Sequence, residues 1–268
     1  MKDMLINNLT NSVQGSVENL NSAIQILSNG MTATYTAEAN NIQTLIKPLA
    51  MTLLSILFLV DLIDMSTRKG DEMRWEDVAR ALIKLLICKN LMIIAPTIMS
   101  AMYNSIAATI GAVLSGSVST NLVDVLKATF EASIPDDATG VLESIMTALK
   151  QVMAYIEILI SCLIVNFVSI FIKVMSYGRM FELTVLESLS PIPIAFAGWG
   201  ETKDVPKRFL MSYFGTCLQG LAMVVCYKIF LAIIGSPASI GEFLMFTVCL
   251  LVGCFSSGKW AKDSLGLV

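Results

Sequence analysis

The sequence predicts an all-α, multi-pass membrane protein with five transmembrane helices, one re-entrant segment broken by prolines, and an N-terminal amphipathic helix. Three observations predict this class. Of the 268 residues, 55% are hydrophobic and only 15% are charged, with a mean hydropathy of +0.72, which is more apolar than a soluble domain of this length needs. The apolar residues come in runs of about 20, enough to cross a hydrocarbon core of about 30 Å. Short charged or proline-containing connections separate these runs.

Composition also argues against several classes of function. The chain has no histidine, which removes the commonest general base and the commonest metal ligand. Its net charge of −3 gives no broad basic surface for nucleic acid. The six cysteines all lie in apolar runs without a CxxC pair, so we interpret them as small packing residues. We therefore expect no enzyme, no cofactor and no metal site.

Residues 1–44 form the extracytoplasmic segment of the expected topology and are rich in Asn, Ser and Thr. Apolar residues recur every three or four positions from Leu5 to Leu27, so they line one face of a helix that ends near Asn29 and Gly30. Two interpretations fit equally well. The helix lies on the membrane surface, or it binds in a groove of a neighbouring subunit.

Residues 45–268 form the predicted transmembrane domain. Its five spans are expected at about 45–65, 81–110, 151–175, 209–234 and 242–257. Between the second and third spans, residues 111–150 are expected to form an acidic outer loop with helical pieces.

Prolines break the apolar stretch 180–199. Pro191 and Pro193 each lack a backbone donor that a spanning helix needs, and each disfavours helical backbone at the residue before it. We expect a helix to about Leu189, a turn at 190–193 and a return to Trp199 on the same side of the membrane.

The distribution of basic residues supports this re-entrant course. If 180–199 crosses the membrane, the 18 Lys and Arg residues divide nine against nine between the two sides. If it re-enters, with the N-terminus outside and the C-terminus inside, thirteen lie inside and five outside. Because cytoplasmic loops collect Lys and Arg, the sequence predicts the N-out, C-in arrangement.

Ionisable side chains inside the spans need a partner or water, since each costs about 2.5–3.5 kcal/mol on insertion scales. Asp61 and Asp64 end the first span, while Arg80 and Lys84 begin the second. Ion pairs between the two helices are therefore expected. For Asp61, Asp64 and Lys84 we favour a structural role over the lining of an aqueous path, because all three lie near the interface.

Two further sets of charges lie deeper in the predicted membrane. Glu157 and Lys228 reach similar depths and are expected to form an ion pair. Glu182 and Glu187, on the arm before the prolines, are five residues apart and do not share a helix face. For these two, the lining of a cavity and a structural pair remain equally open.

These features together resemble a known family. The first span ends in acidic residues, and a charged connection containing Trp75 leads into a helix that bears Lys and Arg. A Pro-Ile-Pro stretch, a short basic loop and the run FLMSYFGTCLQGLAMVVCYKIF follow. The pattern resembles the TrbL family of VirB-type inner-membrane subunits of type IV secretion systems, especially its Gram-positive branch. The resemblance covers about residues 45–258 and is strongest over Glu187–Phe230.

The resemblance implies a scaffold or channel subunit in the bacterial cytoplasmic (inner) membrane. It implies a five-fold ring of copies, surrounded by lipid, where DNA or protein crosses during conjugation. Other inner-membrane secretion subunits and transport ATPases are the implied partners. The matching site is the Pro191 and Pro193 turn, Trp199 and the basic residues Lys203, Lys207 and Arg208. These residues form a cytoplasmic contact loop or a lipid-facing anchor, and both interpretations stay open.

The alternative function is that of a secondary transporter or ABC-type permease, in which broken helices bind a solute near the middle of the membrane. An internal inverted repeat and a cytoplasmic coupling helix, both typical of such proteins, are not evident in the sequence. The two functions can be separated by particle size and by stabilisation with solutes.

Overall fold

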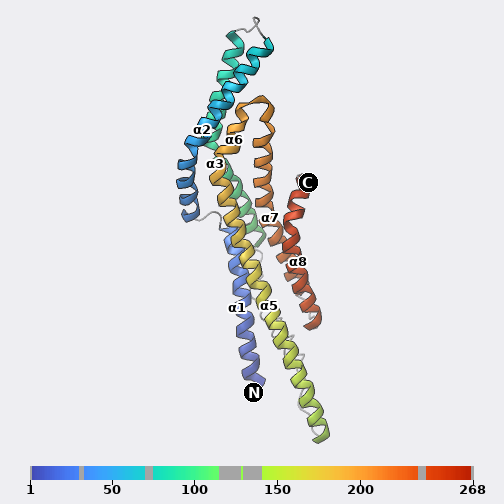
Figure 1. The fold of residues 1–268 in the computed structure, drawn as a ribbon. Helices are drawn as coiled ribbons and strands as arrows, with labels where there is room; N and C mark the ends of the chain where they lie inside the picture. The colour runs from blue at the N-terminus through green and yellow to red at the C-terminus, as the bar shows by residue number, and fades with distance from the viewer. Residues whose placement is uncertain are drawn as a thin grey trace. The chain divides into compact units, whose positions relative to one another are not determined.

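The computed structural model describes residues 2–29, 33–69, 75–114, 128, 141–234 and 240–266, and every regular element among them is a helix. The predicted all-α class is confirmed. Most of the expected outer loop at 111–150 lies outside the described residues. In chain order (Figure 1) the elements are α1 (Lys2–Ser28), α2 (Ala33–Lys69), α3 (Trp75–Leu114), α5 (Val141–Leu189), α6 (Pro191–Ala195), η2 (Phe196–Gly198), η3 (Gly200–Thr202), α7 (Asp204–Ile234) and α8 (Ile240–Ser264).

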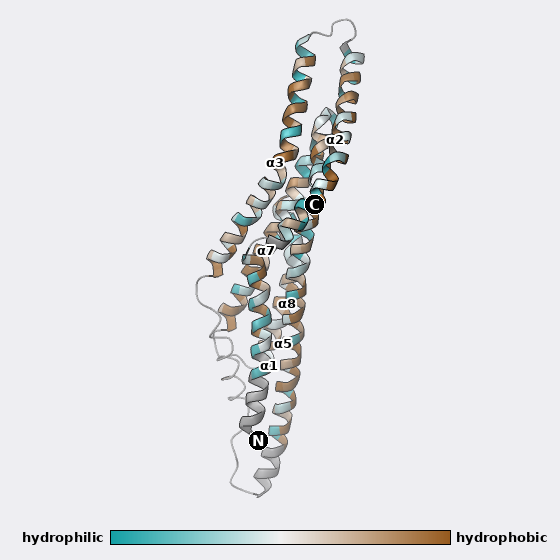
Figure 2. Cartoon of the chain, turned by 90° about the vertical axis from the view of Figure 1, so that its left-hand side faces the viewer, coloured by the Kyte–Doolittle hydropathy of each residue, from teal (hydrophilic) through white to brown (hydrophobic). Residues whose placement is uncertain are grey.

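Five of the described helical stretches are long and apolar enough to cross a membrane, as the sequence predicts. They are Tyr35–Arg68, Trp75–Leu114, Leu149–Gly198, Gly200–Ile234 and Gly241–Ser264. Hydrophobic residues dominate long parts of α3 and α5 (Figure 2). The large aliphatic and aromatic side chains exposed along these helices are what a hydrocarbon environment accepts and water does not.

Helix α5 is longer than the sequence predicts. The third span was expected to end at Met175 and to be followed by a separate arm, but α5 runs without interruption to Leu189. Its 49 residues are more than twice the roughly 20 that one crossing needs. The chain therefore does not turn back between Met175 and Arg179, and the arm before the prolines continues the third span. The re-entrant course and the N-out, C-in orientation stay predictions.

The chain divides into two compact units, each with its own packing. The first unit comprises Met1–Ser28, Thr109–Gly178 and Gln219–Lys259. Its core joins one face each of α1, α5, α7 and α8, with Ile158, Tyr227 and other buried apolar residues at the contact. The second unit comprises Asn29–Ala108, Arg179–Leu218 and Trp260–Val268.

Within the first unit, α1 ends at Ser28, close to the predicted end. In the part of α1 that the structure describes, however, the apolar face makes neither of the two expected contacts. Leu20, Ile24 and Leu27 are buried against helices of the same chain rather than facing lipid headgroups or a neighbouring subunit. Periodicity showed that one face of this helix is apolar, but the contact that buries the face is set by residues more than 130 positions away.

In the second unit, α6 packs against α2 and α3. Buried small residues make this close contact feasible: Ala50 of α2, Ala95 of α3 and Ala195 of α6 belong to one apolar cluster with Leu54 and Ile194. Polar links reinforce the unit. The hydroxyl of Tyr213 on α7 donates a hydrogen bond of 3.2 Å to the backbone oxygen of Met99 on α3.

Candidate functional site

The predicted helix break is present after Leu189, but its geometry differs from the expectation. Ser190 keeps helical backbone angles, with φ −53° and ψ −31°, although a proline follows it. Pro191 then begins the short helix α6, a position where a missing N–H costs nothing because the first donors of a helix are unpaired. The backbone becomes extended only at Trp199, with φ −108° and ψ 136°. The chain therefore leaves helical geometry at Trp199, not at the prolines.

A buried amide supplies the hydrogen bond that the first proline cannot make. In a continuous helix the N–H of residue 191 would bond to the carbonyl of Glu187, but Pro191 has no N–H. The side-chain Nε2 of Gln43, on α2 and only 1% exposed, donates to that carbonyl oxygen at 3.0 Å. The N–H of Ser190 also donates to it, at 3.2 Å. Gln43 thus ties α2 to the point where α5 ends.

We expect Gln43→Leu to lower the free energy of unfolding by about 1–2 kcal/mol, because a buried carbonyl then loses one of its two donors. Asn40→Leu, at an exposed position one turn earlier on α2, is the control and should change stability by less than about 0.5 kcal/mol. Thermal unfolding in detergent, followed with a thiol-reactive dye, measures both. Equal midpoints for the two variants would contradict this role of Gln43.

One charged residue of α2 joins three elements around the break. Asp61 is 7% exposed, and its Oδ2 accepts a hydrogen bond from Lys84 Nζ of α3 at 3.1 Å. Its Oδ1 accepts from the backbone N–H of Gly200 in η3 at 3.4 Å. The structure therefore brings together Asp61 and Lys84, as expected. The bond to the backbone of Gly200 was not expected, and through it the Asp61 carboxylate fixes the extended turn as well as α2 and α3.

The second acidic residue of that span pairs differently from the expectation. Asp64 bonds to Arg68 on its own helix at 3.0 Å, not to Arg80. Arg68 also reaches Glu201 of η3 at 3.4 Å. Because these groups are largely exposed to solvent, the pairs contribute little to stability, about 0–1 kcal/mol each.

Close packing holds the rest of the turn. A Cβ on Gly198 would lie 2.7 Å from Cδ1 of buried Leu54, so only a residue without a side chain fits against α2 without displacing it. The hydroxyl of Thr202 donates to the carbonyl oxygen of Phe196 at 2.7 Å, and this hydrogen bond joins the end of η3 to the start of η2. The path from α6 to α7 is thus fixed by its own residues and by α2.

Several buried polar atoms beside the break have no hydrogen-bond partner among the described residues. They are Oε2 of Glu187, Oγ of Ser190 and Nε1 of Trp199. Glu187 is 4% exposed. Glu182, by contrast, is partly exposed and pairs with Arg179 one turn before it. The two glutamates occupy different environments, as their spacing indicates.

The other expected pair lies in the first unit. Glu157 of α5 is exposed, and Lys228 of α7 is half-buried. Their ion pair stays a prediction.

The basic loop opens onto a groove of the second unit. Lys207 and Arg208 at the start of α7 line it together with Lys262 of α8. The groove has a volume of about 760 Å³ and also includes Asp204 and Ser212. Lys203 is exposed but does not line it. The sequence does not predict the roles of Lys262 and Gln43, because the residues that each of them contacts or lies beside are far away in the sequence.

Among the described residues, no group of three His, Cys, Asp or Glu side chains is arranged to hold a metal ion. The site is instead a set of structural contacts around an interrupted helix, beside a basic groove. The fold and this site define a multi-pass, all-helical membrane protein built around a proline-broken helix.

Comparison with known families identifies the chain more narrowly. The family described as "TrbL/VirB6 plasmid conjugal transfer like protein" matches residues 22–191, more than half of the sequence. The chain belongs to this family and is a multi-pass inner-membrane component of conjugal transfer by type IV secretion. The match includes α2, α3 and α5 and ends at Pro191, the first residue of α6, so it leaves out most of the stretch Glu187–Phe230, where the sequence resembles the family most strongly. No curated protein and no solved structure matches the chain.

Proposed function

We propose that the chain is a scaffold and channel subunit of a conjugative type IV secretion machine, assembled as a ring of copies that helps pass DNA or protein across the cytoplasmic membrane. The observation that carries the proposal is the family match over residues 22–191 on a chain with five apolar helices. The family is a structural component of secretion systems, and the site described above consists of packing and ion-pair contacts, which fits a scaffold better than an enzyme.

The basic groove gives this role a contact surface. Lys207, Arg208 and Lys262 place three cations around one opening, which suits the phosphates of a nucleic acid or an acidic surface of a transport ATPase. The anchored turn before α7 holds the first two cations in place through Asp61 and Gly200. Within the predicted cytoplasmic loop, Lys207 and Arg208 make the contact, whereas Lys203, which does not line the groove, does not take part in it.

The size of the particle tests the proposed assembly. Purified in mild detergent, the protein should run as one species of four or more copies, with five expected from the family resemblance. It should also be captured with other subunits of the same conjugation machinery. A monomer or dimer that a small solute stabilises against heat would contradict the ring and would support the alternative of a transporter or permease.

A further inference from the structure

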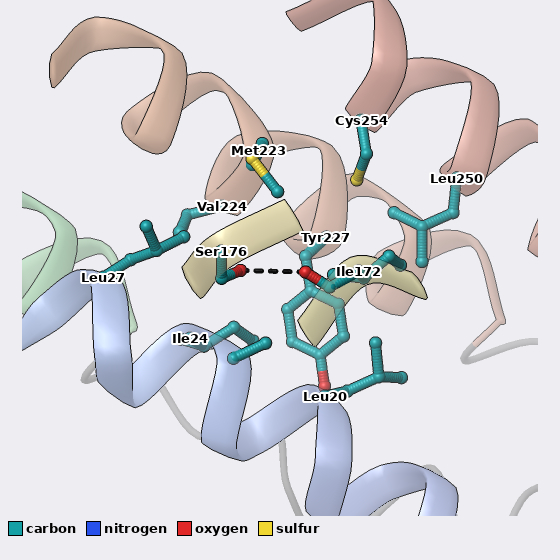
Figure 3. Close-up of a pocket in the computed structure, with 11 residues that line it drawn as sticks. Leu20, Ile24, Leu27, Ile172, Ser176, Met223, Val224, Tyr227, Leu250 and Cys254 are labelled. Carbon is teal, nitrogen blue, oxygen red and sulfur yellow. Dashed lines mark hydrogen bonds between the residues drawn. The ribbon is translucent and has the colours of Figure 1, made fainter. Parts of the chain in front are cut away.

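The N-terminal helix α1 packs against the apolar helices α5, α7 and α8. Its residues Leu20, Ile24 and Leu27 point into a small apolar pocket together with Tyr227 of α7 and Leu250 of α8 (Figure 3). The pocket also includes Ala23 of α1, Ile172 and Ser176 of α5, Met223 and Val224 of α7, and Cys254 of α8. These contacts place about two turns of α1 directly against three of the five membrane-spanning helices.

Two polar contacts fix the register of α1 on α5. Ser16, which is fully buried, donates a hydrogen bond of 2.6 Å to Asn166 Oδ1. One turn further along α1 and two turns further along α5, Lys173 Nζ donates to Asn19 Oδ1 at 3.0 Å. Asn166 and Lys173 of α5 are therefore matched by polar groups of α1, and α1 is an integral part of the first unit.

Apolar side chains surround this contact on the outer surface of the same unit. Phe167 and Val174 of α5 flank Ile172 in the sequence and are 60% and 61% exposed. Ile229 of α7 and Val252 of α8 follow Tyr227 and Leu250 and are 55% and 57% exposed. Such surfaces require hydrocarbon around them. The contact residues of α1 then lie within the hydrocarbon layer, and not outside the membrane as expected for residues 1–44.

The outward face of α1 is polar at that same depth. Gln14, Glu18 and Gln25 are exposed, and Asn21 between them is half-buried. Their spacing of four, three and four residues places them in one stripe along the helix. We propose that this stripe, residues 14, 18, 21 and 25, faces water inside the membrane and lines an aqueous path.

The stripe must face water because the alternative, contact with lipid chains, costs too much free energy. Amide and carboxylate groups cannot face lipid chains without losing their hydrogen bonds, and polar residues at this depth line either protein contacts or water-filled cavities. The stripe carries three amides and one carboxylate and no cation. Such a lining solvates a hydrophilic polymer without holding its phosphates. The identification of a passing polymer rests on the proposed function, whereas the contact of the stripe with water does not.

Cysteine labelling tests the proposal in the full-length protein in membranes. Glu18→Cys and Gln25→Cys are made in a Cys249→Ser background, because Cys249 is the one native cysteine of the six that is exposed. The controls are Phe167→Cys and Val252→Cys, at exposed apolar positions of the same unit. A charged, membrane-impermeant methanethiosulfonate reagent should modify the stripe positions at least about tenfold faster than the controls, because the reagent travels only through water.

Equal and slow reaction at all four positions would overturn the proposal. So would efficient disulfide cross-linking of Glu18→Cys to the same position of another copy, because the stripe would then be covered by protein. Native Cys162 and Cys254 are buried and should stay unreacted until the sample is heated, which verifies that each variant is folded. Labelling does not depend on transfer or on ring size. A monomeric particle with reactive stripe positions would therefore reject the proposed function and leave this inference standing.

Discussion

Lys84→Met lowers the free energy of unfolding by about 2–3 kcal/mol, because it leaves the buried Asp61 carboxylate with only the long hydrogen bond from Gly200. The value lies below the roughly 3–5 kcal/mol typical of breaking a fully buried pair, since the Lys84 side chain is 37% exposed. The midpoint of thermal unfolding in detergent measures the change. The buried thiol of Cys88, in the same unit, reports on the local loss of structure through a thiol-reactive dye.

Two further variants separate the ion pair from general effects of the substitution. Arg68→Met removes a cation that is 67% exposed and should cost less than about 1 kcal/mol. Asp61→Leu combined with Lys84→Met replaces both partners by apolar groups and should recover at least half of the loss, because no unpaired buried charge remains. If Lys84→Met and Arg68→Met have the same effect, Asp61 does not anchor the turn.

Reversing the three charges of the groove with Lys207→Glu, Arg208→Glu and Lys262→Glu should lower the frequency of conjugal transfer by about 100-fold or more. Three attractive contacts with an anionic partner become three repulsive ones. All three side chains are at the surface, so the amount of protein in the membrane should not change. Transfer frequency between mating cells is the measurement.

Lys203→Glu is the matched control for the groove. Lys203 is exposed in the same loop but does not line the groove, and its reversal should lower transfer by less than about threefold. In solution, the purified protein should bind single-stranded DNA in a salt-dependent way that the triple variant loses. Normal transfer by the triple variant would show that the groove does not contact an anionic partner.

The sequence predicted features that depend on nearby residues. The end of α5 at Leu189 follows from Pro191 and Pro193, which remove two backbone donors within one turn, whereas the single prolines Pro48 and Pro96 do not end α2 and α3. The contact between Asp61 and Lys84 follows from a short connection that returns the chain beside the first long helix. Neither needs knowledge of distant partners, and the five apolar helices likewise follow from composition alone.

Features that depend on distant residues were not predicted. The third span was expected to end at Met175, but α5 continues to Leu189, and Lys173 near the expected end donates to Asn19 of α1 across 154 positions. Gln43 supplies a donor to the carbonyl of Glu187 across 144 positions. A side chain that completes a hydrogen bond at such a separation leaves no periodic signal in the sequence.

The most direct test of the account is whether the transferred molecule contacts this chain during mating. Formaldehyde cross-linking in mating cells, capture of the chain under denaturing conditions and amplification of the transferred DNA strand provide the measurement. We predict that the strand is recovered with the chain in mating cells and is lost when the transport ATPase is inactivated. Transfer at a normal frequency with no strand recovered, although other subunits of the machinery capture it, would contradict the account.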